Sequence, residues 1–172
     1  QLPDVRITGG AKAELDGARW QADADLKALW ADLGKLSPSL PKGGRSEWRL
    51  SANAQSTDAG FAVNRLAITG HGVKIAIRQT LTWKGGLLPA NADDATVTIA
   101  ADDADLLALN PFLAPAGVIV TAGRWTGEAS VSFKDGQPTV RSIRTHSLPG
   151  VTLEQAGKPL LRGIDAELPV SS

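Results

Sequence analysis

The sequence predicts a mainly β fold built from two related units, each with one short helix. Three observations lead to this prediction. Apolar and polar residues alternate over long stretches, few stretches have helical spacing, and one seven-residue segment, the repeated phrase, occurs twice in nearly the same form. Residues 23–29 and 103–109 agree at six of seven positions. Because internal repetition indicates a chain built from similar units, we expect one domain over 1–172 with internal units of about 1–102 and 103–172.

The first unit is expected to begin with short strands and to continue as a helix over residues 25–36. Leu26, Trp30 and Leu33 lie at helical spacing, Asp25 can cap the first turn, and Pro38 ends the helix. The short strands are expected at 5–8, 11–15 and 19–22.

The clearest strand signal covers residues 71–84, where apolar side chains share one parity and polar side chains the other. This pattern predicts one long strand with an apolar face and a wet face. Residues 61–68 are expected to pair with it through a turn at 69–72, and a change of parity predicts a β-bulge near Asn64 and Arg65. Further strands are expected at 48–54 and 96–100.

The second unit repeats this theme less regularly. A helix is expected over 105–113 and is interrupted by Pro111. Strands are expected at 117–121, 127–133, 138–145 and 160–170, with glycine-containing turns between them.

The composition excludes several classes of function. Lys plus Arg number 18 and Asp plus Glu number 18, so no net charge favours nucleic acid or an anionic membrane surface. Cysteine is absent, which excludes disulfides and thiolate metal sites. No run approaches the roughly 18 apolar residues of a membrane span. Because the sequence lacks an initial methionine, we expect a processed product or a piece of something longer, with any membrane anchor outside it.

No motif for catalysis, a cofactor or a metal is present. His71 and His146 have no metal-ligating neighbour at the required spacing and are expected in surface turns. The acidic clusters at 93–94 and 102–105 lack the pattern of a calcium loop and are expected in turns and helix caps. We therefore expect a protein that is not an enzyme and that uses neither cofactor nor metal.

The helix phrase Asp-Leu-x-x-Leu, the following Pro/Gly break and long strands such as residues 61–85 resemble the AsmA-like and TamB-like proteins of the Gram-negative envelope. The likeness covers about residues 5–170. The resemblance implies a curved antiparallel sheet with an apolar inner face, called a β-groove or taco. It also implies a periplasmic or cell-envelope location and a role in moving phospholipid between membranes, as part of outer-membrane biogenesis. It provides no catalytic residues.

The leading hypothesis is a non-catalytic groove that binds lipid or another hydrophobic ligand, with envelope membrane proteins as further partners. An apolar strip would shield acyl chains from water. The strip is expected to consist of Trp48, Leu50, Phe61, Val63, Val73, Ile75, Ile77, Leu81, Trp83, Val97, Ile99, Val131 and Phe133.

Two other classes of function remain open. In a structural or interaction module of an envelope or secretion assembly, the apolar face would be closed by the chain itself, for example by a helix over 25–36, and exposed strand edges would bind partners. A carbohydrate-active enzyme would need carboxylates that converge in a cleft. Whether the apolar face is open separates the first two hypotheses.

Overall fold

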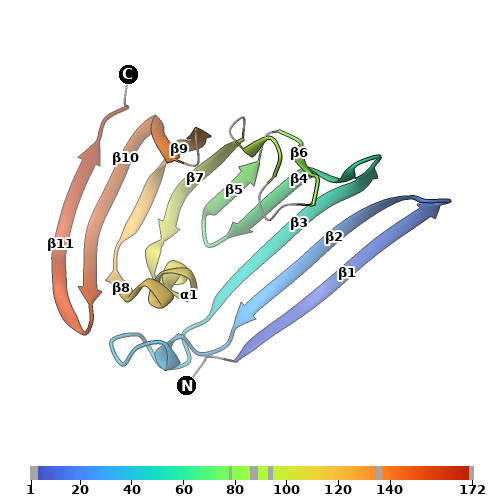
Figure 1. The fold of residues 1–172 in the computed structure, drawn as a ribbon. Helices are drawn as coiled ribbons and strands as arrows, with labels where there is room; N and C mark the ends of the chain where they lie inside the picture. Colours follow the sequence, from blue (N-terminus) through green and yellow to red (C-terminus); the bar gives the residue numbers. More distant parts are fainter. Residues whose placement is uncertain (1–3, 78, 86–88, 93–94, 135–136, 171–172) are drawn as a thin grey trace.

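The computed structural model describes residues 4–77, 79–85, 89–92, 95–134 and 137–170. Its strands form one antiparallel sheet in the order β1-β2-β3-β4-β5-β7-β9-β10-β11, with β6 beside β4 and β8 beside β10 (Figure 1). The sheet is not closed, because β1 and β11 each have only one neighbour among the described strands. The strands are β1 (Val5–Asp16), β2 (Arg19–Trp30), β3 (Ser46–Thr57), β4 (Gly60–Gly70), β5 (Val73–Ile77), β6 (Leu81–Trp83), β7 (Thr96–Asp105), β8 (Val118–Ala122), β9 (Arg124–Lys134), β10 (Gln137–Gln155) and β11 (Lys158–Leu168).

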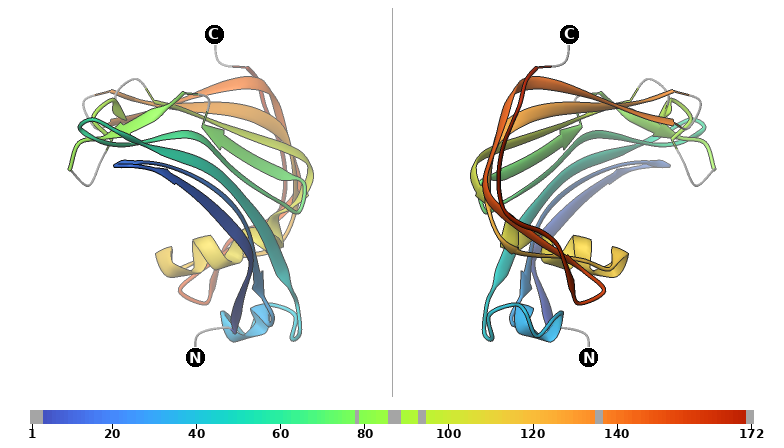
Figure 2. Two further views of the ribbon diagram at one scale, coloured as in Figure 1. Left: turned by 90° about the vertical axis from the view of Figure 1, so that its right-hand side faces the viewer. Right: turned by 90° about the vertical axis from the view of Figure 1, so that its left-hand side faces the viewer.

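The strands bend along their length, so that the sheet forms an arch (Figure 2). A helical segment, residues 106–116, lies on the concave side near the lower margin of the arch. It consists of a 3₁₀ turn (Leu106–Leu109), the short helix α1 (Asn110–Leu113) and a second 3₁₀ turn (Ala114–Ala116). The chain exposes 10720 Å², whereas a compact protein of this size would expose about 8,000 Å². The large surface follows from a sheet that is not folded onto a second layer.

The two faces of the arch differ in chemistry. Directly paired residues of neighbouring strands lie on the same face of a sheet. The register from Leu26 through Leu50, Ile68, Ile75 and Ile99 therefore places these apolar side chains together. The helical segment lies against this face, which identifies it as the concave one.

The convex face carries charged pairs between neighbouring strands. Lys27 on β2 lies 2.7 Å from Glu47 on β3, and Arg49 on β3 contacts Asp25 on β2. These pairs are exposed to solvent, so each adds little to stability. Over β2 and β3 the convex face is thus a wet face, as the alternation in the sequence predicts, whereas Ala62 and Thr98 on the same side of the sheet are buried.

The details around β4 confirm one prediction and correct another. Arg65 pairs with Asn53 and Val63 pairs with Ala54, so Asn64 is the extra residue of the predicted bulge. The hairpin turn before Val73 is also confirmed. The single strand expected over 71–84 is wrong: β5 and β6 are separate strands, and they pair with β4 on either side of its bulge.

The helix expected over 25–36 is also wrong. Strand β2 continues to Trp30, and only a 3₁₀ turn, Leu33–Lys35, follows it. The second copy of the repeated phrase does enter a helical turn at Leu106. The two copies therefore have different conformations, so the prediction of one helix in each unit fails.

We expect the free energy of unfolding to fall at acid pH, because carboxylates of the convex face are paired with arginines. Arg49 and Arg124 donate hydrogen bonds to Asp25 and Asp103, and these bonds lower the pKa of both carboxyl groups. Their unfolded pKa is about 3.9, so the stabilisation is present above about pH 4 and is lost as the pH falls through the lower folded value.

Urea unfolding of the unmodified chain and of an Asp25→Asn/Asp103→Asn variant, followed from pH 6 to pH 2, measures this contribution. The unmodified chain should lose more stability on acidification, and the difference should shrink in 1 M salt. Identical acid profiles for the two proteins would contradict the assignment.

Candidate functional site

The candidate site is the concave face of the arch. The register places twelve of the predicted groove residues on it. The thirteenth, Phe133, belongs to β9, but its side chain lies outside the described part of the structure. The twelve are Trp48 and Leu50 on β3, Phe61 and Val63 on β4, Val73, Ile75 and Ile77 on β5, Leu81 and Trp83 on β6, Val97 and Ile99 on β7, and Val131 on β9.

The helical segment covers the lower margin of this face. The Phe112 ring meets Trp48 edge-on at a centroid distance of 5.2 Å and Trp30 at 5.6 Å. The Ser46 hydroxyl donates to the carbonyl of Ala108 at 2.8 Å and accepts a hydrogen bond from Trp48 Nε1 at 2.7 Å. Trp48 is only 3% exposed as a result. One aromatic cluster and one buried hydroxyl thus fasten the segment to the sheet.

Asn110 fastens the same segment to β8. Its Nδ2 donates to the carbonyls of Leu107 and Val120, each at 2.8 Å, and its Oδ1 accepts from the amide of Val120 at 2.8 Å. The side chain is fully buried. Buried backbone groups need hydrogen-bond partners. Asn110 supplies these partners to the amide and the carbonyl of Val120, on the edge of β8 that faces away from β10.

A second contact joins the two sides of the lower margin. Ser39, in the loop between β2 and β3, donates a hydrogen bond to Glu154 Oε2 on β10 at 2.6 Å. Leu33 and Leu40 in the same loop are buried. The chain's own residues therefore close the lower margin.

The upper margin of the concave face contains more exposed apolar side chains than the lower margin. Trp20, Phe61 and Trp83 form an aromatic row there, with Phe61 and Trp83 stacked at 5.0 Å and Trp20 at 6.5 Å from Phe61. Phe61 is 38% exposed, and Leu15, on the neighbouring hairpin, is 78% exposed. Leu81, two residues before Trp83 on β6, is nevertheless only 6% exposed, so part of this margin is covered.

The floor between the margins combines small and aliphatic residues. Leu26, Leu66, Ile77 and Val97 occupy central positions of the sheet, yet each is only partly buried. Such residues become fully buried when a second layer covers a sheet. Small side chains make the floor shallow over β2 and β3. The cross-strand pairs there are Ala22 with Ala54, Ala24 with Ala52 and Ala28 with Trp48.

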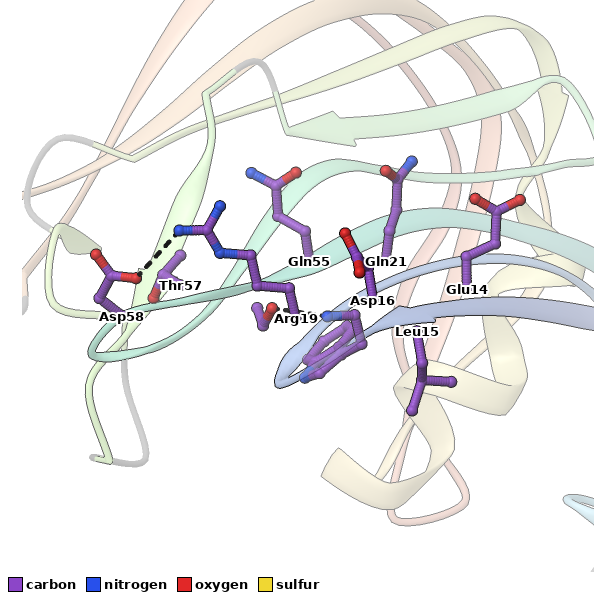
Figure 3. Close-up of a pocket in the computed structure, with 10 residues that line it drawn as sticks. Glu14, Leu15, Asp16, Arg19, Gln21, Gln55, Thr57 and Asp58 are labelled. Atoms are coloured by element: carbon purple, nitrogen blue, oxygen red, sulfur yellow. Dashed lines mark hydrogen bonds and ion pairs between the residues drawn. The ribbon is translucent and has the colours of Figure 1, made fainter.

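A hollow of about 580 Å³ adjoins the tips of the first two hairpins (Figure 3). Polar side chains line most of it, including the ion pair between Arg19 and Asp58 at 4.0 Å. In Figure 3, Leu15 points away from Glu14 and Gln21. The hollow is therefore a polar border of the upper margin, and the apolar floor lies on the other face.

The sequence reasoning missed the contribution of β1 and β2 to the concave face. A signal was present, because every second residue from Trp20 to Trp30 is apolar. The helical spacing of Leu26, Leu29, Trp30 and Leu33 competed with it. The missed residues of the face are Val5, Ile7, Ala11, Ala13, Leu15, Trp20, Ala22, Ala24, Leu26, Ala28 and Trp30.

Each of the two histidine rings accepts a hydrogen bond from an N–H group. His71 lies in the expected turn with a φ of 49°, and its Nε2 accepts a hydrogen bond from the amide of Glu47 at 2.8 Å. The expectation of a surface turn is wrong for His146, which lies within β10 and is 8% exposed. Its ring stacks on Trp125, and its Nδ1 accepts from Trp125 Nε1 at 2.9 Å. Within the described ranges, no group of three or more metal-ligating side chains occurs.

None of the helices in the described residues has the length and apolar character to span a membrane. No family model, curated protein or solved structure matches the chain.

Proposed function

We propose that the concave face is a β-groove that binds the acyl chains of lipid and conducts them between membranes. The observation that carries this proposal is the partial exposure of the floor, at Leu66, Ile77 and Val97 in the middle of the sheet. An apolar surface this extensive is costly in water. A hydrophobic guest would remove it from water and supply the missing second layer.

The physical mechanism is burial without specific bonds. Each CH₂ group transferred from water to the groove contributes roughly 0.8 kcal/mol. Along the strand order the floor runs from β1 to β9, which is seven strands, and six inter-strand spacings of about 4.8 Å give a length near 29 Å. Because apolar contacts have no direction, an acyl chain can slide along such a floor. A polar head group would remain in solvent at the upper margin, beside Arg19 and Asp58.

The resemblance to AsmA-like and TamB-like proteins supports a place in the periplasm or cell envelope. It also supports an arrangement in which related β units extend one groove. Envelope membrane proteins would be the partners that load and unload the lipid.

The closed lower margin favours a second candidate, an interaction module of an envelope assembly. There the chain's own Phe112, Trp30 and Trp48 already fill the apolar face, and binding would take place at the strand edges. In this case the upper margin would exclude lipid.

A pair of adjacent substitutions distinguishes the two candidates. Ala54→Glu places a charge on the concave floor between Ala22 and Val63, whereas Gln55→Glu places the same charge on the convex face one residue away. Burying a carboxylate against an acyl chain is costly. We expect Ala54→Glu to weaken binding of a fluorescent fatty acid at least tenfold and Gln55→Glu to leave it unchanged.

Binding is measured by fluorescence titration, and mass spectrometry of the purified protein identifies any lipid that copurifies. Urea unfolding of both variants controls for folding. Failure of the unmodified protein to bind the probe, together with the absence of copurified lipid, would overturn the lipid proposal in favour of the interaction module.

A further inference from the structure

Strand β1 presents a long edge with which no other described strand pairs, and its protection is limited to charged side chains such as Lys12 and to Gly9, whose φ is 133°. Its twelve residues contain no proline, pair with β2 without a register shift and are all exposed. Its charged side chains lie on the convex face. Natural sheets protect edges with charged side chains, especially lysine, and more strongly with prolines, bulges or charges that point inward. The opposite edge has such devices, because β11 contains Pro159 and Gly163 with a φ of 54°, and its pairing with β10 shifts register three times.

The turn after β1 determines which backbone groups are free. Asp16 pairs with Arg19 across the two-residue turn Gly17–Ala18, and such a pair exchanges hydrogen bonds. Hydrogen-bonded and non-hydrogen-bonded pairs alternate along an antiparallel ladder. The even-numbered residues of β1 therefore bond to β2. The odd-numbered residues with extended backbone, from Val5 to Leu15, direct their N–H and C=O groups outward, whereas Gly9 departs from extended backbone with a φ of 133°.

The sequence of β1 is complementary to itself in one antiparallel register. With Gly10 facing Gly10 on a two-fold axis, Arg6 of one copy lies opposite Glu14 of the other, twice. On the concave face, Val5 meets Leu15 and Ile7 meets Ala13. Asp4 then lies near Asp16 at each end, where Lys35, 2.9 Å from Asp4, supplies a cation.

Neighbouring registers fit less well. A shift by two residues in one direction places Arg6 opposite Lys12, and like charges that face each other across strands destabilise the pair. A shift in the other direction leaves Val5 without a partner. The register centred on Gly10 pairs all six outward-facing residues of each copy and forms about twelve backbone hydrogen bonds, a number typical of protein interfaces.

We propose that two copies of this chain pair through β1, antiparallel and in register about Gly10, to form a dimer with one continuous sheet. The concave faces of the two copies then join across the two-fold axis. This inference rests on the edge of β1 and does not depend on what the concave face binds.

A disulfide can report the register, because the chain contains no cysteine. A Cβ at Gly10 has no atom within 4 Å, so Gly10→Cys fits without strain. In the proposed dimer the two residues at position 10 form a non-hydrogen-bonded pair with Cα atoms about 4.5 Å apart, within the range that a disulfide spans. Two residues at position 12 are separated by about 14 Å in this register, so Lys12→Cys is the matched control.

We expect Gly10→Cys to form a covalent dimer on mild oxidation and Lys12→Cys to remain monomeric on a non-reducing gel. Equal cross-linking of the two variants, or cross-linking of Ala11→Cys but not of Gly10→Cys, would overturn the register.

A charge exchange tests the pairing by equilibrium sedimentation. Arg6→Glu and Glu14→Arg should each raise the dimer dissociation constant about tenfold, because two attractive pairs become repulsive. The double variant should restore the original value. Arg6 and Glu14 are exposed, so urea unfolding measured at concentrations where the chain is monomeric should be unchanged in all three variants. A chain that sediments as a monomer at every concentration, or a double variant that fails to rescue pairing, would overturn the proposal.

Discussion

Replacement of Asn110 by leucine is expected to destabilise the protein by about 4 kcal/mol. Leucine has a similar size but cannot bond to the carbonyls of Leu107 and Val120 or to the amide of Val120. A buried backbone group without a partner costs about 1–3 kcal/mol, and several such groups would be left at once. The loss approaches the whole stability of a small domain, which is about 5–15 kcal/mol.

Urea unfolding followed by tryptophan fluorescence measures this loss. Asn53→Leu is the matched control, because Asn53 lies on the convex face, where it donates to Asp23 and accepts from Asn64, both side chains that water can reach. Its cost should stay within about 0.5 kcal/mol, as for most surface substitutions. Equal midpoints for the two variants would show that the contacts of Asn110 do not hold the helical segment in place.

Trp48→Ala is expected to cost a similar amount, about 4 kcal/mol, for a different reason. The substitution leaves a cavity beneath Phe112 and removes the hydrogen bond from the indole to Ser46. It should loosen the helical segment as well as the sheet, because Trp48 packs between them. Amide hydrogen exchange should therefore increase at residues 106–116 more than in β1.

The corresponding substitution at the upper margin should behave differently. Trp20 lies on the same face but is only partly buried, so Trp20→Ala should cost about half as much as Trp48→Ala. If the groove proposal holds, Trp20→Ala weakens binding of the fatty-acid probe nonetheless. Far-ultraviolet circular dichroism is the readout for stability, since both variants lose a tryptophan. A larger loss of stability for Trp20→Ala than for Trp48→Ala would contradict the assignment of the more exposed upper margin and the closed lower margin.

Sequence patterns predicted the central strands well. The alternation through Trp48, Leu50, Val73 and Ile75 correctly indicated one apolar face, because these residues belong to strands with neighbours on both sides. The bulge at Asn64 was also predictable, since it changes the parity of the alternation. The sequence could not indicate the order of the strands or the segment that covers the lower margin, because both depend on contacts between distant residues.

The repeated phrase shows that the local sequence alone does not determine secondary structure in this protein. In β2 its residues pair with β1 and β3 on both sides, and this pairing overrides the helical spacing of Leu26 and Leu33. In the second copy Asp103 has a φ of 46°, Asp105 accepts a hydrogen bond from the amide of Leu107, and Pro111 follows. These features end the strand and start a helical turn. Nearly identical heptapeptides thus adopt different conformations because their neighbours differ.

The bulge at Asn64 has a consequence for how such a molecule can diversify. A bulge bends the strand that contains it, and β4 bends where its partner strand is split into β5 and β6. One inserted amino acid therefore changes the width of the arch, while the residues on its concave face stay the same. Insertions and deletions at this point would therefore give related proteins arches of different width.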